Sequence, residues 1–284
     1  MSKKYRIGSL IVENDTVVNC DKKHVGIIIV PNDVKHIGPY VFEDCTSLTS
    51  LTIPDGVTSI GRSAFYGCTS LESIKIPDSV TSIGNYAFDD CTSLTSITIP
   101  NSVTRIGCDA FAGCTSLTNI TIPDSVISIG DSAFRNCKSL TSITIPDSIT
   151  SIGWGAFSYC TSLESAIIGD GVTSIGAFAF ECCTSLKSIT IPDSVLNIGN
   201  FVFRNCSSLQ TLVLNSNNID YIKSLGVPKS TVVKCNPDSI TDKSAKNAGY
   251  TTEPIMTHLQ KALLQAKEAI VQNNKNTLSL DLER

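Results

Sequence analysis

The chain has 284 residues, of which 42% are hydrophobic, 17% charged and 6% aromatic, and its formal net charge is −4. This apolar fraction excludes intrinsic disorder, and the nearly balanced charge, without clusters of Lys and Arg, argues against nucleic-acid binding. No apolar run approaches the ~20 residues needed to cross a bilayer, so we expect no membrane span.

The first 29 residues predict an N-terminal β cap. Three short apolar segments, at residues 5–11, 16–18 and 25–29, are separated by polar turns and are typical of strands. Such a cap would cover the open end of the unit that follows it. Lys3 and Lys4 are not followed by an apolar core and a small-residue cleavage site, so we expect no signal peptide.

Residues 30–213 form eight units of 23 residues without insertion or deletion. A constant period in this range indicates a solenoid or another repeat array. Val41 and Val202 replace the Ala of the other units in the first and last units only, and terminal units of solenoids are commonly atypical. The period is marked by a cysteine ladder: Cys45, Cys68, Cys91, Cys114, Cys137, Cys160, Cys183 and Cys206.

Each unit predicts a strand, a turn and a short return segment. Leu94, Ile97 and Ile99 alternate as in a strand with one face inward, and Pro100 ends that strand. A Gly, such as Gly84, recurs in all eight units, where the backbone needs either a positive φ or a close approach. The spacing of Ala87, Phe88, Cys91 and Leu94 then favours one or two turns of α- or 3₁₀-helix. Stacked units would form a parallel sheet, which gives an α/β fold class.

After residue 213 the period decays. Residues 214–253 predict degenerate repeats and a C-terminal cap, with strands near 220–222 and 231–233 and a short helix at 244–249 that Gly249 stops. Residues 254–284 predict an amphipathic helix, opened by Pro254, and a tail. The apolar stripe of this helix either packs on its own domain, as we expect for a monomer, or forms an assembly or partner interface: Ile255, Leu259, Leu263 and Ile270.

The repeated pattern resembles a known family. Cys-x-x-Leu-x-x-Ile-x-Ile-Pro-x-x-Val-x-x-Ile-Gly-x-x-Ala-Phe is similar to the BspA-like, or treponemal-type, leucine-rich repeat, over residues 30–213. The resemblance implies a right-handed leucine-rich-repeat solenoid with its parallel sheet on the concave face. It also implies an adhesion or host-interaction protein of bacteria or protists, and it brings no catalytic residues.

The sequence offers little that predicts an enzyme, a cofactor or a metal site. We expect the ladder cysteines to be buried and reduced, because identical positions in a stack face the same core. Cys182, next to Cys183, is the candidate for an exposed thiol. No C-x-x-C pair, nucleophile elbow or phosphate loop is present. A row of Asp residues recurs in the turn after the strand and is typical of turn chemistry: Asp55, Asp78, Asp124, Asp147, Asp170 and Asp193.

A binding surface is predicted from the differences between units. The outward positions of the strands are a nearly uniform Ser/Thr surface, which lacks the aromatic and Arg anchors typical of interfaces. The variable positions lie just after the Gly and just before the Cys of each unit, and they hold aromatic residues. These either pack between turns or form a partner site. The candidate ligand-binding residues are Tyr66, Tyr86, Trp154, Tyr159, Phe178 and Phe201.

We therefore expect a non-enzymatic protein-interaction or adhesion module. Its partner class is a protein, for which the resemblance favours an extracellular-matrix or host surface protein. The alternative is an intracellular scaffold that assembles through the C-terminal helix. The thiols and the absence of a signal peptide favour the cytoplasm, whereas the resemblance favours the cell surface.

Overall fold

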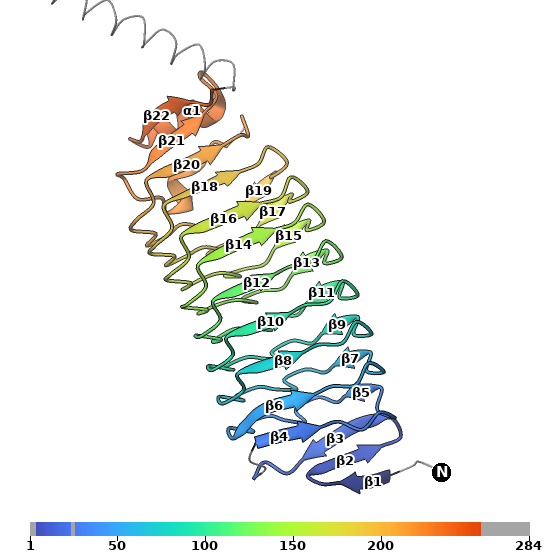
Figure 1. Cartoon of the computed structure of the whole chain (residues 1–284). Coiled ribbons are helices and arrows are strands. Elements are labelled where there is room, and N and C mark those ends of the chain that lie inside the picture. The colour runs from blue at the N-terminus through green and yellow to red at the C-terminus, as the bar shows by residue number, and fades with distance from the viewer. Residues whose placement is uncertain (1–3, 24–25, 218, 257–284) are drawn as a thin grey trace, which may run out of the picture.

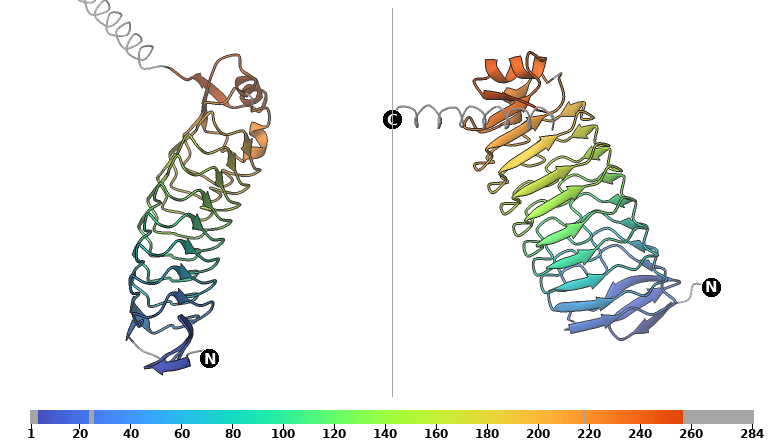
Figure 2. Two further views of the ribbon diagram at one scale, coloured as in Figure 1. Left: turned by 90° about the vertical axis from the view of Figure 1, so that its right-hand side faces the viewer. Right: turned by 45° about the horizontal axis from the view of Figure 1, so that its top comes forward.

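The computed structural model describes residues 4–23, 26–217 and 219–256. They form an elongated solenoid in which successive units stack along one axis (Figure 1). The N-terminal strands and the C-terminal strands lie at opposite ends of the stack (Figure 2). The eight units of 23 residues are kept, and the cap strands at both ends extend the solenoid to about ten turns.

One long side of the solenoid carries the expected parallel strands, here called the strand face. Within the described residues these strands form a five-stranded and a six-stranded sheet, which meet between units 4 and 5. The first sheet contains β4 (Gly26–Ile29), β6 (Leu48–Thr52), β8 (Ser73–Lys75), β10 (Ser96–Thr98) and β12 (Asn119–Thr121). The second contains β14 (Ser142–Ile145), β16 (Ser165–Ile168), β18 (Ser188–Ile191), β20 (Thr211–Leu214), β21 (Val232–Cys235) and β22 (Thr251–Pro254).

A second parallel sheet, which the sequence analysis did not predict, runs along another side of the solenoid. It pairs the two residues before each Gly, a polar residue followed by Ile, in register with those of the next unit, as Ser59 pairs with Ser82 and Ile60 with Ile83. Its two-residue strands are β5 (His36–Ile37), β7 (Ser59–Ile60), β9 (Ser82–Ile83), β11 (Arg105–Ile106), β13 (Ser128–Ile129), β15 (Ser151–Ile152), β17 (Ser174–Ile175) and β19 (Asn197–Ile198).

The segment between the Gly and the Leu of each unit is not an α-helix, and of the two expected alternatives it follows the 3₁₀ one, as a series of tight turns and not as a continuous helix. Within a unit the bonds span three residues, as from Cys68 N–H to the Phe65 carbonyl at 3.1 Å. The other amides point out of the unit, as Phe65 N–H donates to the Ala87 carbonyl at 2.8 Å. A continuous helix would use these amides internally, whereas here they join one unit to the next.

The glycine column is explained by close approach. A Cβ atom on Gly84 would lie 2.7 Å from the carbonyl carbon of Gly61, and one on Gly61 would lie 2.8 Å from that of Gly38. Real Cβ atoms do not approach backbone atoms this closely. Because Gly has no Cβ, the backbone just after each strand of the second sheet can lie directly against the backbone of the unit below.

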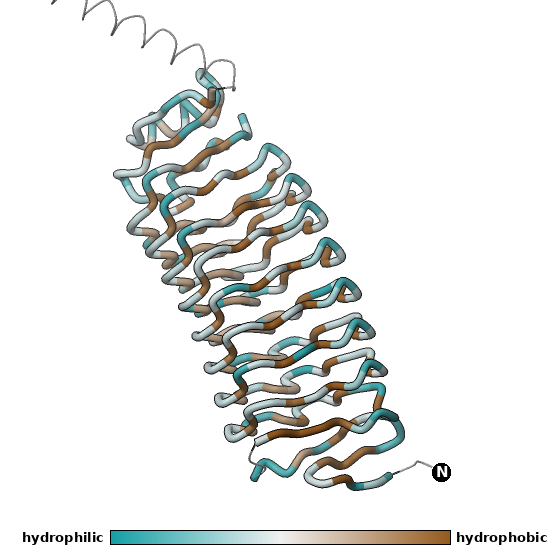
Figure 3. The backbone as a smooth tube through the Cα atoms, in the orientation of Figure 1, coloured by the Kyte–Doolittle hydropathy of each residue, from teal (hydrophilic) through white to brown (hydrophobic). Residues whose placement is uncertain are grey.

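The core is built from columns of identical side chains. The eight Phe rings of the units are fully buried, and successive rings stack at 5.0–6.1 Å. All eight ladder cysteines are also buried, as expected from their common position. Apolar residues recur at the same place in each turn (Figure 3). Each unit thus buries its apolar face only against copies of itself.

The N-terminal cap consists of three antiparallel strands, β1 (Lys4–Ile7), β2 (Leu10–Glu13) and β3 (Thr16–Cys20). β3 then pairs in parallel with β5 and joins the cap to the second sheet. The last strand expected in this region, β4, pairs in parallel with β6, so it is already part of the strand face.

The C-terminal cap differs from the expectation in two elements. The segment expected as a strand at residues 220–222 instead runs into a 3₁₀-helix, η1 (Ile222–Leu225), and Pro254, expected to open a helix, ends β22. The expected short helix is present as α1 (Ile240–Asn247), with Gly249 in the left-handed region (φ 79°) just after it. The rest of the expected amphipathic helix, residues 257–284, lies outside the described residues.

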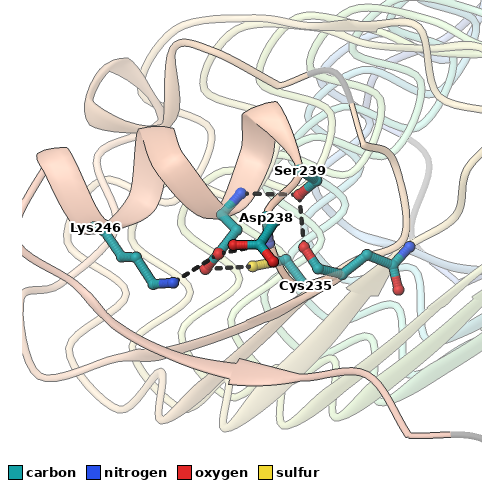
Figure 4. A network of polar contacts seen from close by, with 6 residues as sticks. Cys235, Asp238, Ser239 and Lys246 are labelled. Carbon is teal, nitrogen blue, oxygen red and sulfur yellow. Dashed lines mark hydrogen bonds and ion pairs between the residues drawn. The ribbon is translucent and has the colours of Figure 1, made fainter.

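A buried carboxylate holds the C-terminal cap together (Figure 4). Asp242 is 3% exposed and accepts hydrogen bonds from the Lys246 ammonium at 2.7 Å and from the Asp238 amide at 3.0 Å. The Ser239 hydroxyl caps α1 by accepting from the Asp242 amide. The Lys246 hydrogen bond lowers the pKa of Asp242 from its ordinary value of 3.8.

We expect Phe134→Ala to destabilise the solenoid by ~3–5 kcal/mol, because it leaves a cavity between two stacked rings. Phe134 lies 5.4 Å from Phe111 and 5.3 Å from Phe157. Urea unfolding followed by circular dichroism measures the change. Ile127→Ala is the control, since Ile127 is 53% exposed, and it should cost less than about 0.5 kcal/mol. Similar losses for both variants would contradict the stacked-ring core.

We expect Asp242→Asn to lower the melting temperature at pH 7 and to leave it unchanged in strong acid. Because the folded pKa of Asp242 is lowered, its stabilisation is present above its ordinary pKa of 3.8 and is lost as the pH falls through the folded value. Melting curves from pH 7 to pH 2 test this. The prediction fails if the wild-type and variant curves stay equally far apart over the whole range.

Candidate functional site

The variable residues of all units lie together on the turn side of the solenoid, here called the turn ridge. It consists of the two residues after the Gly and the two residues before the Cys in each of the eight units. The second and the fourth of these residues have a left-handed backbone in every unit, with φ between 50° and 69°. Each unit thus contains two left-handed positions in its turns, which only Gly occupies without strain.

Most of the left-handed positions hold residues that tolerate this conformation. Eight of the sixteen are Gly, Asn or Asp, and two are Ser: Asp44, Ser63, Gly67, Asp90, Asp109, Gly113, Ser132, Asn136, Gly155 and Asn205. Of the other six positions, one holds Cys182. The remaining five hold large aromatic residues: Tyr40, Tyr86, Tyr159, Phe178 and Phe201. A bulky side chain there costs ~1–2 kcal/mol relative to Gly, so fold stability does not explain these aromatics.

Three of the predicted residues form one exposed cluster. The Trp154 ring meets the Phe178 ring edge-on at 5.6 Å, and Phe178 stacks on Phe201 at 5.5 Å. Trp154 is 50% exposed and Phe201 is 42% exposed. We call this set the aromatic cluster. Packing between turns and exposure to solvent, which the sequence analysis treated as alternatives, occur together here.

Two residues of the unit below hold the backbone of Trp154 in place. The Trp154 amide donates to the Asp131 carboxylate at 2.7 Å, and its carbonyl accepts from the Ser132 amide at 2.7 Å. In this unit Gly155 takes the left-handed position, so the aromatic residue stands one place earlier than in the next two units.

Two charged residues that the sequence analysis did not select complete the cluster. The Arg204 guanidinium lies 5.2 Å from the Phe178 ring and 5.7 Å from the Phe201 ring. Its Nε donates to the Glu181 carboxylate at 2.6 Å, and Glu181 is buried. The ion pair with Glu181 fixes the guanidinium in place, so the cluster is an aromatic surface with a cation held over its rings.

The other predicted residues lie outside this cluster. Tyr159 is 40% exposed on the Cys side of the ridge. Cys182, expected as an exposed thiol, is only partly buried, and the Asn205 amide nitrogen lies 3.5 Å from its sulfur. No ring contact joins Tyr66 or Tyr86 to the aromatic cluster within the described residues, and Arg62 lies over Tyr86 at 5.2 Å.

The N-terminal half of the ridge is acidic. Carboxylates, Asp89 first among them, raise the pKa of the Tyr66 hydroxyl. Burial, followed by the charges of Asp90 and Asp109, raises the pKa of Asp89 itself to about 7. The ridge therefore changes along the solenoid from a half in which tyrosines stand among carboxylates to a half that carries the aromatic cluster.

The strand face is the competing surface. Its outward side chains are mostly Ser and Thr in register, as in the pairing of Ser96 with Ser73. Ile167 of unit 6, 63% exposed, replaces Thr, and Gly169 of unit 7 replaces Pro, next to an open depression of about 450 Å³. No ring contact or buried charge orders this surface in the part of the chain that the structure describes.

Two other site types can be assessed over the described residues. No group of three or more His, Cys, Asp and Glu side chains among them is arranged to hold a metal ion. None of the helices in these ranges is long and apolar enough to cross a bilayer.

Comparison with protein families shows the family to which the chain belongs. The BspA type leucine rich repeat region matches residues 18–141 and 128–226, in six copies. The chain belongs to the BspA-type leucine-rich repeat family. BspA-type proteins are in general non-enzymatic binding modules. No curated protein matches the chain.

Solved structures show the same fold. The leucine-rich repeat protein of T. pallidum is 26% identical, with a TM-score of 0.56 over 84% of this chain and 89% of that protein. The pneumococcal vaccine antigen PcpA is 19% identical, with a TM-score of 0.53 over 82% of this chain and 56% of that protein. The first similarity covers the solenoid nearly end to end.

We expect Phe201→Gly to lower the free energy of unfolding by only ~0–2 kcal/mol. Glycine removes a left-handed strain of ~1–2 kcal/mol, which offsets part of the ~0.5–1.5 kcal/mol from ring stacking and the ~1–2 kcal/mol from the buried part of the ring, which is 42% exposed. Phe203→Gly is the control, because Phe203 is fully buried, and it should cost ~3–5 kcal/mol. Equal losses in urea unfolding would make Phe201 a core residue.

Proposed function

We propose that the protein is a non-enzymatic adhesion module of the BspA-type family, which binds a partner protein through its aromatic cluster. The observation that carries the proposal is the exposed contact series Trp154–Phe178–Phe201 under the Arg204 guanidinium. Trp, Tyr and Arg are the residue types that dominate binding energy in protein interfaces. An extracellular-matrix or host surface protein is the partner class that we propose.

The backbone strain supports a binding role for these aromatics. Phe178 and Phe201 occupy left-handed positions at which most units carry Gly, Asn, Asp or Ser. The left-handed backbone costs each aromatic ~1–2 kcal/mol relative to Gly, and its ring contacts only offset that cost, so binding of a partner is the role that a Gly at the same position could not fill.

The order of the cluster supports the same role. Arg204 is held by Glu181, and Phe178 lies between Trp154 and Phe201. Side chains that are already fixed lose little conformational entropy when a partner binds. Within the described residues no aromatic ring or buried ion pair anchors the strand face, whose outward side chains are mostly Ser and Thr.

The proposal predicts that ridge variants lose binding and strand-face variants keep it. Immobilised fibronectin, laminin and collagen are the probes, and surface plasmon resonance measures binding of the wild-type chain. Trp154→Ala combined with Phe201→Gly should weaken any observed binding by at least about tenfold, as expected for truncated interface anchors. Circular dichroism must show that this variant is folded.

The matched control changes the strand face in the neighbouring units. Replacement of Ser142, Thr144, Ser188 and Thr190 by Ala should leave the dissociation constant within about twofold, because these residues carry little interface energy. If the strand-face variant loses binding while the ridge variant keeps it, the proposal that the partner binds the aromatic cluster is wrong. Absence of wild-type binding to all three probes would count against the adhesion role.

A further inference from the structure

Two exceptions to the repeat stand close together on the strand face, where units 6 and 7 meet. Ile167 occupies the position that Thr144 and Thr190 hold in the neighbouring units. Gly169 occupies the position at which the other seven units carry Pro. The strands concerned lie side by side, because β14 pairs with β16 through Thr144 and Ile167 (Figure 1). Two differences at one place in a regular array indicate a role that the fold alone does not require.

Gly169 packs directly against the turn of the unit below. Its amide donates to the Ile145 carbonyl at 2.8 Å, a hydrogen bond that Pro could not make. A Cβ atom on Gly169 would lie 2.6 Å from a carboxylate oxygen of Asp147 and 2.7 Å from the Asp147 amide nitrogen. A larger residue would displace this turn, so Gly169 holds the chain that follows Ile167 against Asp147.

An open depression of about 450 Å³ lies at these residues, across the boundary between the five-stranded and the six-stranded sheet. Among its lining residues Ile122 and Ile145 are buried, and Ile167 is 63% exposed. An exposed Ile gains free energy when another aliphatic group covers it. The depression therefore offers an apolar surface to a ligand.

Two carboxylates, those of Asp124 and Asp147, line the same depression, and no described Lys or Arg does. They come from the turns of successive units, whose strands are ~4.8 Å apart. The Asp147 carboxylate accepts a hydrogen bond from the Asp170 amide at 2.8 Å, which fixes its position. Among the described residues neither Asp124 nor Asp147 belongs to an ion pair. The apolar surface is thus bordered by negative charge that no cation compensates.

We propose that this depression is a docking site for a lysine or arginine side chain from a basic segment of a partner protein. Such a side chain carries a cation on an aliphatic stem, so the stem packs on Ile167 while the cation meets the carboxylates of Asp124 and Asp147. A purely apolar side chain leaves these carboxylates unpaired, and an acidic side chain is repelled by them. The site lies on the strand face, so the inference goes beyond the proposed function of the turn ridge and does not depend on it.

The test is an NMR titration of the full chain, labelled at its isoleucine methyl groups, with a capped pentapeptide that carries a central lysine between two valines. Loss of one signal in Ile167→Thr assigns the Ile167 methyl. We expect the lysine peptide to shift this signal in a saturable way. A peptide with norleucine, which has an aliphatic chain and no charge, should bind about fivefold more weakly. Equal affinity of both peptides, or no shift of the Ile167 signal, would overturn the proposal.

Matched variants separate the depression from the rest of the surface. Ile167→Thr restores the residue of the neighbouring units, and Asp147→Asn removes a charge but keeps the acceptor for the Asp170 amide. Each should weaken binding of the lysine peptide about three- to tenfold, as read from the remaining isoleucine signals of the depression. Ile127→Thr and Asp78→Asn change the same residue types elsewhere and should leave the affinity within about twofold.

The proposal fails if the two pairs of variants have the same effect on the affinity for the lysine peptide. The peptide and all four variants leave the aromatic cluster unchanged. Failure of this docking site is therefore distinguishable from failure of the proposed function.

Discussion

The whole structure depends on backbone hydrogen bonding between successive turns. Each unit is joined to its neighbours along the strand face, along the second sheet and along the turn ridge. In a parallel ladder the residues must stay in register, so each unit needs the same number of residues between one ladder and the next. The eight equal units follow from this constraint, and so does the glycine at the point where two turns meet most closely.

In-register stacking also determines the core. A side chain in the middle of the solenoid has as its main neighbours the same side chain one unit above and one unit below, as Phe134 has Phe111 and Phe157. If a ring packs well against a copy of itself, the same ring is the most stable choice at that position in every unit. Sequence repetition in the core is therefore a packing requirement, while the turn ridge, which has solvent on one side, is free to vary.

The sequence was sufficient for the period, the strand face and the buried columns, because each leaves a periodic apolar signal. The turn conformation was left as one of two alternatives, because the spacing of Ala87, Phe88 and Cys91 fits an α-helix and a series of 3₁₀ turns equally well. The distinguishing signal was the frequent Gly, Asn and Asp at the two left-handed positions. The second sheet was missed because its two-residue strands are too short to show alternation.

The candidate site was predicted in part for similar reasons. Aligning the units revealed Trp154, Phe178 and Phe201 as aromatic exceptions, and the structure brings these three together. Glu181 and Arg204 were not selected, since a charged residue at a variable position is unremarkable alone. They stand at equivalent places in adjacent units, so their contact follows from the stacking and could have been found by comparing neighbouring units for opposite charges.

The exact register of the ladders has a consequence for how such a chain can change in length. Loss or duplication of one complete 23-residue unit in the middle joins surfaces that already match, because Gly meets Gly and Phe meets Phe at the new junction. The rod would shorten or lengthen by about 4.8 Å and keep both caps. A gain or loss of any other number of residues would shift every column past it. Recombination between units is therefore tolerated only in whole steps, and it can move the aromatic cluster relative to either end without rebuilding it.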